Sequence, residues 1–142
     1  MRKCLVPIAC ACLLACGDSG PDFDLQVRVM PHALAPGDTA TIMLRVANLS
    51  GRPQIVQTEC KPPYFVTNAA GDTVSVPGGI LVCYPSEPPG MPMEPNDTLA
   101  RFYFWAGDGG TIANTRLPAG LYTVHGNMDR FRWPTDTIRI LP

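Results

Sequence analysis

The stretch Leu117-Pro118-Ala119-Gly120-Leu121-Tyr122-Thr123-Val124 joins a tight turn to the start of a strand. Proline fixes φ and Gly120 accepts turn conformations, so the chain reverses direction here. Tyr122 and Val124 then fall on one side of an extended chain, because side chains alternate across a strand. The tyrosine either donates its hydroxyl to the backbone of the preceding turn or simply packs in the core. We expect the hydrogen bond, with Leu117 and Gly120 framing the turn.

The same alternation of apolar and polar residues recurs on both sides of this stretch. Strong strands are expected at residues 25–29, 42–46, 100–104, 122–124 and 138–140, and weaker ones at 54–58, 64–67 and 73–76. The 142 residues include 16 prolines and 13 glycines but few glutamates and lysines, a composition that disfavours a helical bundle. The predicted fold class is all-β, an immunoglobulin-like antiparallel β-sandwich of about seven to eight strands.

The first fifteen residues are predicted to be a signal peptide. Their apolar run at 4–14 has the length of a secretory signal and is too short to cross a bilayer as a helix. Leu13-Leu14-Ala15-Cys16 resembles the lipobox of bacterial lipoproteins, which implies lipid on the thiol of Cys16. The alternative is an ordinary cleaved signal with an incidental cysteine. The expected segments are a signal peptide at 1–15, lipidated Cys16 with a short tether at 16–24, and the sandwich at 25–142.

Two cysteines, Cys60 and Cys83, remain after the signal and the lipidation site are set aside. An even pair in an exported domain predicts one disulfide. It would close a loop of about 24 residues, which the chain-entropy model values at roughly 3 kcal/mol. Two separate buried thiols are the alternative. Two cysteines alone would leave a zinc ion under-coordinated.

Charge and motifs exclude several classes of function. Beyond residue 15 the chain has 9 basic residues, once Arg2 and Lys3 are set aside from the 11, and 12 acidic ones. This balance offers no basic surface for nucleic acid. The sequence contains no nucleophile elbow, HExxH motif, phosphate loop or dinucleotide fingerprint, so neither an enzyme nor a cofactor is predicted. A weak alternative is a copper(I) site built from soft thioethers and one imidazole; it would use Met30, His32, Met91 and Met93.

Two loops are candidates for binding. Arg130, Phe131, Arg132 and Trp133 interleave arginine with aromatic residues between the strands at 122–124 and 138–140. In an immunoglobulin-like topology this loop lies at the end where the chain starts, so the tether would hold it near lipid headgroups. The alternative is that Phe131 and Trp133 fold inward and close the sandwich. The proline-rich stretch at 85–95 is interpreted as a stiff crossover rather than a recognition strip.

Several short motifs, taken together, resemble the BsuPI-type proteinase-inhibitor domain, a bacterial family with an immunoglobulin-like fold. They run in order from residue 44 to residue 126: Leu44-x-Val46-x-Asn48, Tyr64-Phe65-Val66 with Gly71-Asp72, the Pro95 turn, Phe104-Trp105 and Leu117-Pro118-x-Gly120-x-Tyr122-x-Val124-x-Gly126. Cys60 and Cys83 bracket an insertion that this pattern lacks.

Two functions follow as expectations. The first is a lipid-anchored, non-catalytic binding or accessory module of the bacterial cell envelope, at the periplasmic face of the outer membrane or at the cell surface. Its partners would be the membrane, through the lipid, and an envelope protein or a protease. The alternative, implied only by the resemblance, is a proteinase inhibitor that acts through a protruding, disulfide-braced loop at 61–82.

Overall fold

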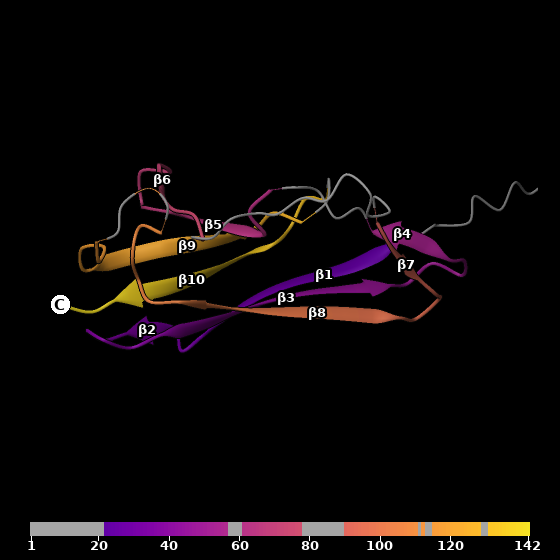
Figure 1. The fold of residues 1–142 in the computed structure, drawn as a ribbon, viewed down its shortest axis with the longest axis horizontal. Coiled ribbons are helices and arrows are strands. Elements are labelled where there is room, and N and C mark those ends of the chain that lie inside the picture. Colours follow the sequence, from indigo (N-terminus) through magenta and orange to yellow (C-terminus); the bar gives the residue numbers. More distant parts are fainter. Residues whose placement is uncertain (1–21, 57–60, 78–89, 111, 113–114, 129–130) are drawn as a thin grey trace, which may run out of the picture.

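The computed structural model describes residues 22–56, 61–77, 90–110, 112, 115–128 and 131–142. No helix forms in these ranges, and none of their segments could span a membrane as a helix. The described residues form ten strands, labelled in Figure 1. They are β1 (Phe23–Met30), β2 (Ala33–Leu34), β3 (Ala40–Asn48), β4 (Gln54–Val56), β5 (Tyr64–Thr67), β6 (Thr73–Ser75), β7 (Met91–Met93), β8 (Thr98–Trp105), β9 (Gly120–Gly126) and β10 (Thr135–Ile140).

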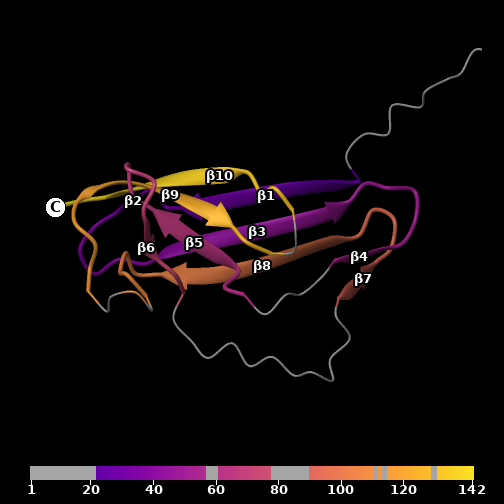
Figure 2. The same ribbon diagram turned by 90° about the horizontal axis from the view of Figure 1, so that it is seen from above.

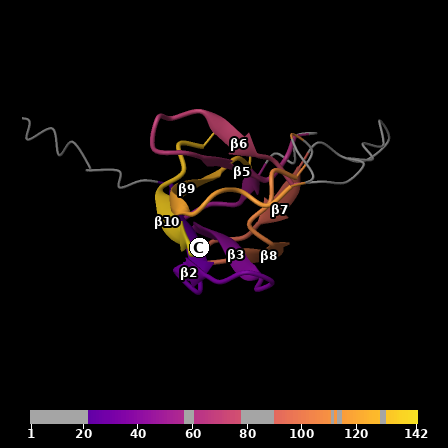
Figure 3. The same ribbon diagram turned by 90° about the vertical axis from the view of Figure 1, so that its left-hand side faces the viewer.

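The strands form two main sheets and a short ribbon. One sheet has the antiparallel order β1-β3-β8, the other has the order β2-β10-β9-β5-β6, and β4 pairs with β7. The chain leaves the first sheet after β1 and joins the second as β2, which runs parallel to β10. Figure 3 shows the two layers end on. The predicted β-sandwich is therefore confirmed, with β2 and β7 as short strands that the sequence did not reveal.

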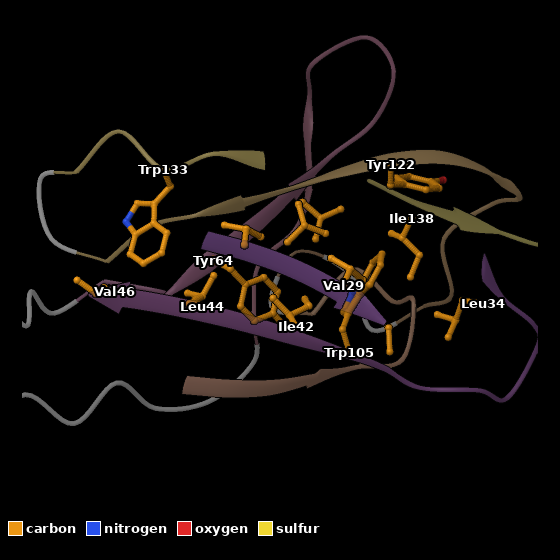
Figure 4. Packing of buried hydrophobic residues seen from close by; sticks show 14 of the residues in the cluster. Val29, Leu34, Ile42, Leu44, Val46, Tyr64, Trp105, Tyr122, Trp133 and Ile138 are labelled. Carbon is orange, nitrogen blue, oxygen red and sulfur yellow. The ribbon is translucent and has the colours of Figure 1, made fainter. Parts of the chain in front are cut away.

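The core lies between the layers because most inward residues of both sheets, at every second position, are apolar. Val29, Ile42 and Leu44 of the first sheet face Val124 and Ile138 of the second, and all five are buried (Figure 4). Trp105 ends β8 inside this core, and its indole N–H donates to Ser75 Oγ at 3.1 Å and to the Asp108 carbonyl at 2.9 Å. A buried indole is thereby satisfied, as burial of a polar group requires.

A carboxylate joins the two sheets where β1 approaches β10. Asp136 Oδ2 accepts the backbone N–H of Val29 at 2.7 Å, and Asp136 Oδ1 accepts that of Thr137 at 2.8 Å. The Val29 bond satisfies a donor on the outer edge of β1, where a free N–H would invite pairing with another chain.

The two ends of the sandwich are closed differently. At one end the Tyr122 hydroxyl donates to the Pro118 carbonyl at 2.8 Å, which is the hydrogen bond that the motif at 117–124 predicts. At the other end Trp133 covers the core and its indole donates to the Met128 carbonyl at 2.7 Å (Figure 4). Gly126 makes this possible, because a Cβ there would lie 2.7 Å from the indole ring.

Candidate functional site

The outer surface of the β1-β3-β8 sheet carries apolar side chains that no other element covers within the described residues. Phe102 and Phe104 of β8 have 58% and 76% of their surface exposed. The register places Phe102 beside Met43, and places Phe104 beside Thr41, whose other neighbour is Met30 of β1. We call Met30, Met43, Phe102 and Phe104 the aromatic face. Large apolar residues on three adjacent strands form a patch, whereas isolated ones need no explanation.

Arginines border the aromatic face. Arg28 of β1 is the cross-strand neighbour of Met43, so it lies in the same row as Phe102. One row further along, Arg45 of β3 binds Asp24 at 2.8 Å in an exposed ion pair. Phe, Met and Arg are the residue types that protein–protein interfaces enrich. The composition of this surface therefore matches an interface rather than an ordinary solvated sheet.

A cleft of about 440 Å³ adjoins the aromatic face at Phe104. The residues that line it are Thr39, Tyr64, Ser75, Pro77, Phe104, Trp105, Ala106, Asp108 and Gly110. Desolvation by burial, followed by the charge of Asp108, raises the pKa of Tyr64 to about 12. The phenol therefore stays protonated, and Asp108 Oδ1 accepts the Gly110 N–H at 3.1 Å. Thr39, Ser75 and Asp108 give the cleft groups that accept and donate hydrogen bonds.

The histidines lie elsewhere. His125 of β9 stacks on Phe65 with ring centroids 4.6 Å apart and bonds Thr67 Oγ1 at 2.9 Å. It is half-buried, and burial lowers its pKa from the usual 6.5. His32 bonds the Thr137 carbonyl at 3.0 Å.

The copper alternative is wrong, because its residues lie at opposite ends of the sandwich. Met30 ends β1, whereas Met93 accepts a hydrogen bond from Asn48, which pairs with the first residue of β1, Phe23. A full eight-residue strand separates the two methionines. Within the described ranges, no three His, Cys, Asp or Glu side chains form a group that could hold a metal ion.

The structure describes part of the predicted binding loop. Arg130 lies outside the described residues, and Arg132 is exposed. Phe131 is half-buried and packs on Phe23 with a centroid distance of 4.8 Å. Trp133 is only 8% exposed, so for this residue the inward alternative is the observed one. The loop does lie at the end where β1 begins, as the predicted topology required.

The protruding inhibitory loop at 61–82 needs correction. Its described part contains β5 and β6, which belong to the five-stranded sheet, and Tyr64 and Val66 of β5 are buried in the core. Among the described residues of this segment, the exposed ones are 69–73, in the turn between the two strands and at the start of β6. Cys60 and Cys83 lie outside the described residues, as does Cys16, so the disulfide and the lipid stay predictions.

Alternation along the chain does not reveal the aromatic face. On β8 both sets of alternating residues are bulky, and Phe102 and Phe104 are as apolar as Leu99 and Tyr103. Only pairing with β3 decides which set faces the core. The cleft was equally hidden, because its residues come from several loops and strands.

Comparison with known proteins supports the fold and adds nothing on function. No protein-family model matches the chain, and no curated protein matches its sequence. The structure is similar to Pseudomonas fluorescens alkylpurine DNA glycosylase AlkC bound to DNA containing an abasic site analog, with 9% identity and a TM-score of 0.56 over 87% of this chain and 32% of that one. It is also similar to a beta-glucosidase from Listeria innocua in complex with gluconolactone, with 8% identity and a TM-score of 0.51 over 84% and 16% of the two chains. The chain thus spans a third or less of these enzymes, and such likeness shows the fold alone.

Proposed function

We propose that this protein is a lipid-anchored, non-catalytic binding module of the bacterial cell envelope, and that it binds a protein partner through the aromatic face. The observation that carries the proposal is the exposure of Phe102 and Phe104 side by side on one strand. The anchor follows from the lipobox-like sequence that ends at Cys16.

The energetics favour contact with a partner. Complete burial of a Phe or Met side chain is worth about 1.5–3 kcal/mol. Two phenylalanines and the neighbouring Met43 on a strand-braced surface can therefore supply several kcal/mol without any ordering of a loop. Strands hold these side chains in place, which is how rigid hot spots are presented.

The chemistry of the border indicates what the partner carries. Arg28 is placed to face a carboxylate at the rim of an interface, where opposite charges mainly select the partner and its orientation. The cleft beside Phe104 adds Asp108 and the Tyr64 phenol, which suit a donor group from the same partner. The partner is thus an apolar protein surface with polar groups at its edge.

Crosslinking in intact cells tests this proposal. A photoreactive phenylalanine analogue replaces Phe104, and in a matched control it replaces Leu121, which is 52% exposed on the other sheet. We expect a defined protein adduct from position 104 that disappears when Phe102→Ser and Met43→Ser are added to the probe-bearing chain. Equal adducts from both positions would contradict the proposal. If the only adduct is with a second copy of this chain, the aromatic face mediates self-association, and the proposal of a different protein partner is wrong.

A further inference from the structure

We propose that the end of the sandwich where β1 begins rests on the membrane surface, with Leu49 and Ile55 inserted among the lipid headgroups. The inference rests on the proposed lipid anchor at Cys16. It assigns a second contact surface, distinct from the aromatic face, whose partner is the lipid bilayer.

The chain enters the sandwich beside Leu49. The backbone N–H groups of Leu49 and Ser50 donate to the Asp22 carbonyl at 2.9 and 3.2 Å. Asp22 follows Cys16 by six positions, and an extended chain of this length spans at most about 22 Å. The lipid anchor must therefore keep this end within about 22 Å of the bilayer. Figure 2 shows the start of β1 beside the connection from β3 to β4.

Two large apolar side chains are exposed on this connection. Leu49 is 57% exposed, and Ile55, six residues further, is 62% exposed on β4. Val56, the next residue, points into the core instead. Leucine and isoleucine prefer the membrane interface to water. Each contributes most to the free energy of membrane binding when it inserts without reordering the chain.

Hydrogen bonds hold this connection in shape. Asn48 Nδ2 donates to the Arg52 carbonyl at 3.0 Å, and Ser50 Oγ lies 2.9 Å from the same carbonyl oxygen. Gln54 Nε2 donates to Ser50 Oγ at 3.2 Å. Leu49 is therefore presented from a braced turn, and little conformational entropy is lost when it inserts.

Charge does not favour one kind of lipid at this end. Arg52 and Arg132 are exposed here, the latter beside Phe131, which packs on Phe23. Carboxylates oppose them: Asp22 is at the entry of the chain, and the β7–β8 turn, which bonds Asn48, adds two more. These two are Glu94 and Asp97. With arginines and carboxylates mixed, apolar insertion and the tether provide the attraction, and anionic lipid adds little.

Depth-dependent quenching of tryptophan tests the inference on the full-length lipidated protein. Leu49→Trp and, as the control, Leu121→Trp are reconstituted in vesicles of phosphatidylethanolamine and phosphatidylglycerol with or without brominated chains. Leu121 is similarly exposed but lies at the opposite end, beside the Tyr122 turn. The emission of unsubstituted protein, from buried Trp105 and Trp133, is subtracted. We expect a blue shift and a bromine-dependent loss of emission for L49W, neither for L121W, and no change when salt is raised.

The outcomes separate the inference from the anchor. Protein that floats with the vesicles but shows no more quenching for L49W than for L121W overturns the membrane contact and leaves the anchor standing. Mass spectrometry that finds an unmodified Cys16 overturns both. Quenching that salt abolishes overturns apolar insertion. Because L49W adds bulk to a braced turn, an Ile55→Trp variant repeats the measurement on β4, and the same expectations apply.

Discussion

Replacement of Asn48 is expected to destabilise the protein more than replacement of any exposed residue. Its buried amide joins several backbone segments at the end of the sandwich where β1 begins, which we call the tether end. Its Nδ2 donates to three carbonyls, those of Arg52, Met93 and Glu94, at 3.0, 3.0 and 3.1 Å. Its Oδ1 accepts the backbone N–H and the hydroxyl of Ser50, at 3.0 and 2.6 Å. The Asn48 side chain is fully buried, and of its partners the Met93 carbonyl is buried while the others are part-buried.

The expected loss follows from these contacts. A hydrogen bond contributes about 0.5–1.5 kcal/mol net, and a buried partner left unsatisfied costs about 1–3 kcal/mol. Some of the five partners regain water, so Asn48→Ala should lower the free energy of unfolding by about 3–5 kcal/mol. This is a large part of the 5–15 kcal/mol that is usual for a domain.

The nearly isosteric variant Asn48→Asp separates hydrogen bonding from packing. It keeps the acceptor that binds Ser50 but places a carboxylate oxygen against three carbonyls, so we expect a loss at least as large as that of Asn48→Ala at neutral pH. Protonation restores a single donor, and this environment favours the neutral acid. The stability lost in Asn48→Asp should therefore be partly recovered as the pH falls through the raised pKa of the new carboxyl.

Urea unfolding followed by tryptophan emission measures both variants at pH 7.5 and near pH 5. An unchanged slope with denaturant would show that the folded state keeps its compactness. A loss below about 1 kcal/mol for Asn48→Ala, or an Asn48→Asp variant that is as stable as the native protein at pH 7.5, would refute the reasoning.

Two further outcomes are expected. Tyr122→Phe removes the hydroxyl that donates to the Pro118 carbonyl and should cost about 1 kcal/mol in urea unfolding, and an unchanged midpoint would count against a structural role for this bond. The free energy of unfolding should also fall as the pH drops below 6.5, because burial lowers the pKa of His125 and the unfolded chain then binds more protons than the folded one. His125→Gln, which can still bond Thr67 and cover Phe65, should flatten this slope above pH 5.5, whereas an unaltered slope would assign the effect to another group.

The sequence predicted the sandwich because its strands are half-buried and alternate cleanly. On β3, Ile42, Leu44 and Val46 are all buried, as their spacing of two residues requires. Alternation does not identify the buried face of strand β8, because outward Phe102 and Phe104 are as hydrophobic as inward Tyr103 and Trp105. Its orientation is set by long-range pairing with β3, which local periodicity does not encode.

Short strands were missed for a different reason. β2 has two residues and β7 has three, too few to show any period. Pro92 also sits in the middle of β7, where a proline usually argues against a strand. A two-stranded ribbon at the edge tolerates it, and Met93 becomes buried while its carbonyl binds Asn48.

The motif Asn48-x-Ser50 shows how a correct pattern can carry an unexpected meaning. It formally matches the sequence pattern of a glycan acceptor. In the structure the asparagine amide is buried and binds Ser50 two residues on, so the spacing instead closes the turn that presents Leu49. Burial of a polar side chain is set by tertiary contacts and could not be inferred from these residues alone.

The two proposed contact surfaces lie at different distances from the end of the sandwich where β1 begins. β8 begins beside Ala47 at the tether end and finishes beside Ala40, so Phe102 and Phe104 stand about 13–20 Å along the strand from that end. A sandwich that rests on the bilayer through Leu49 would hold the aromatic face sideways and clear of the headgroups. Because the surfaces share no residue, lipid and protein could be bound together. Substitutions at one surface should then leave the other's readout unchanged, as independent sites require.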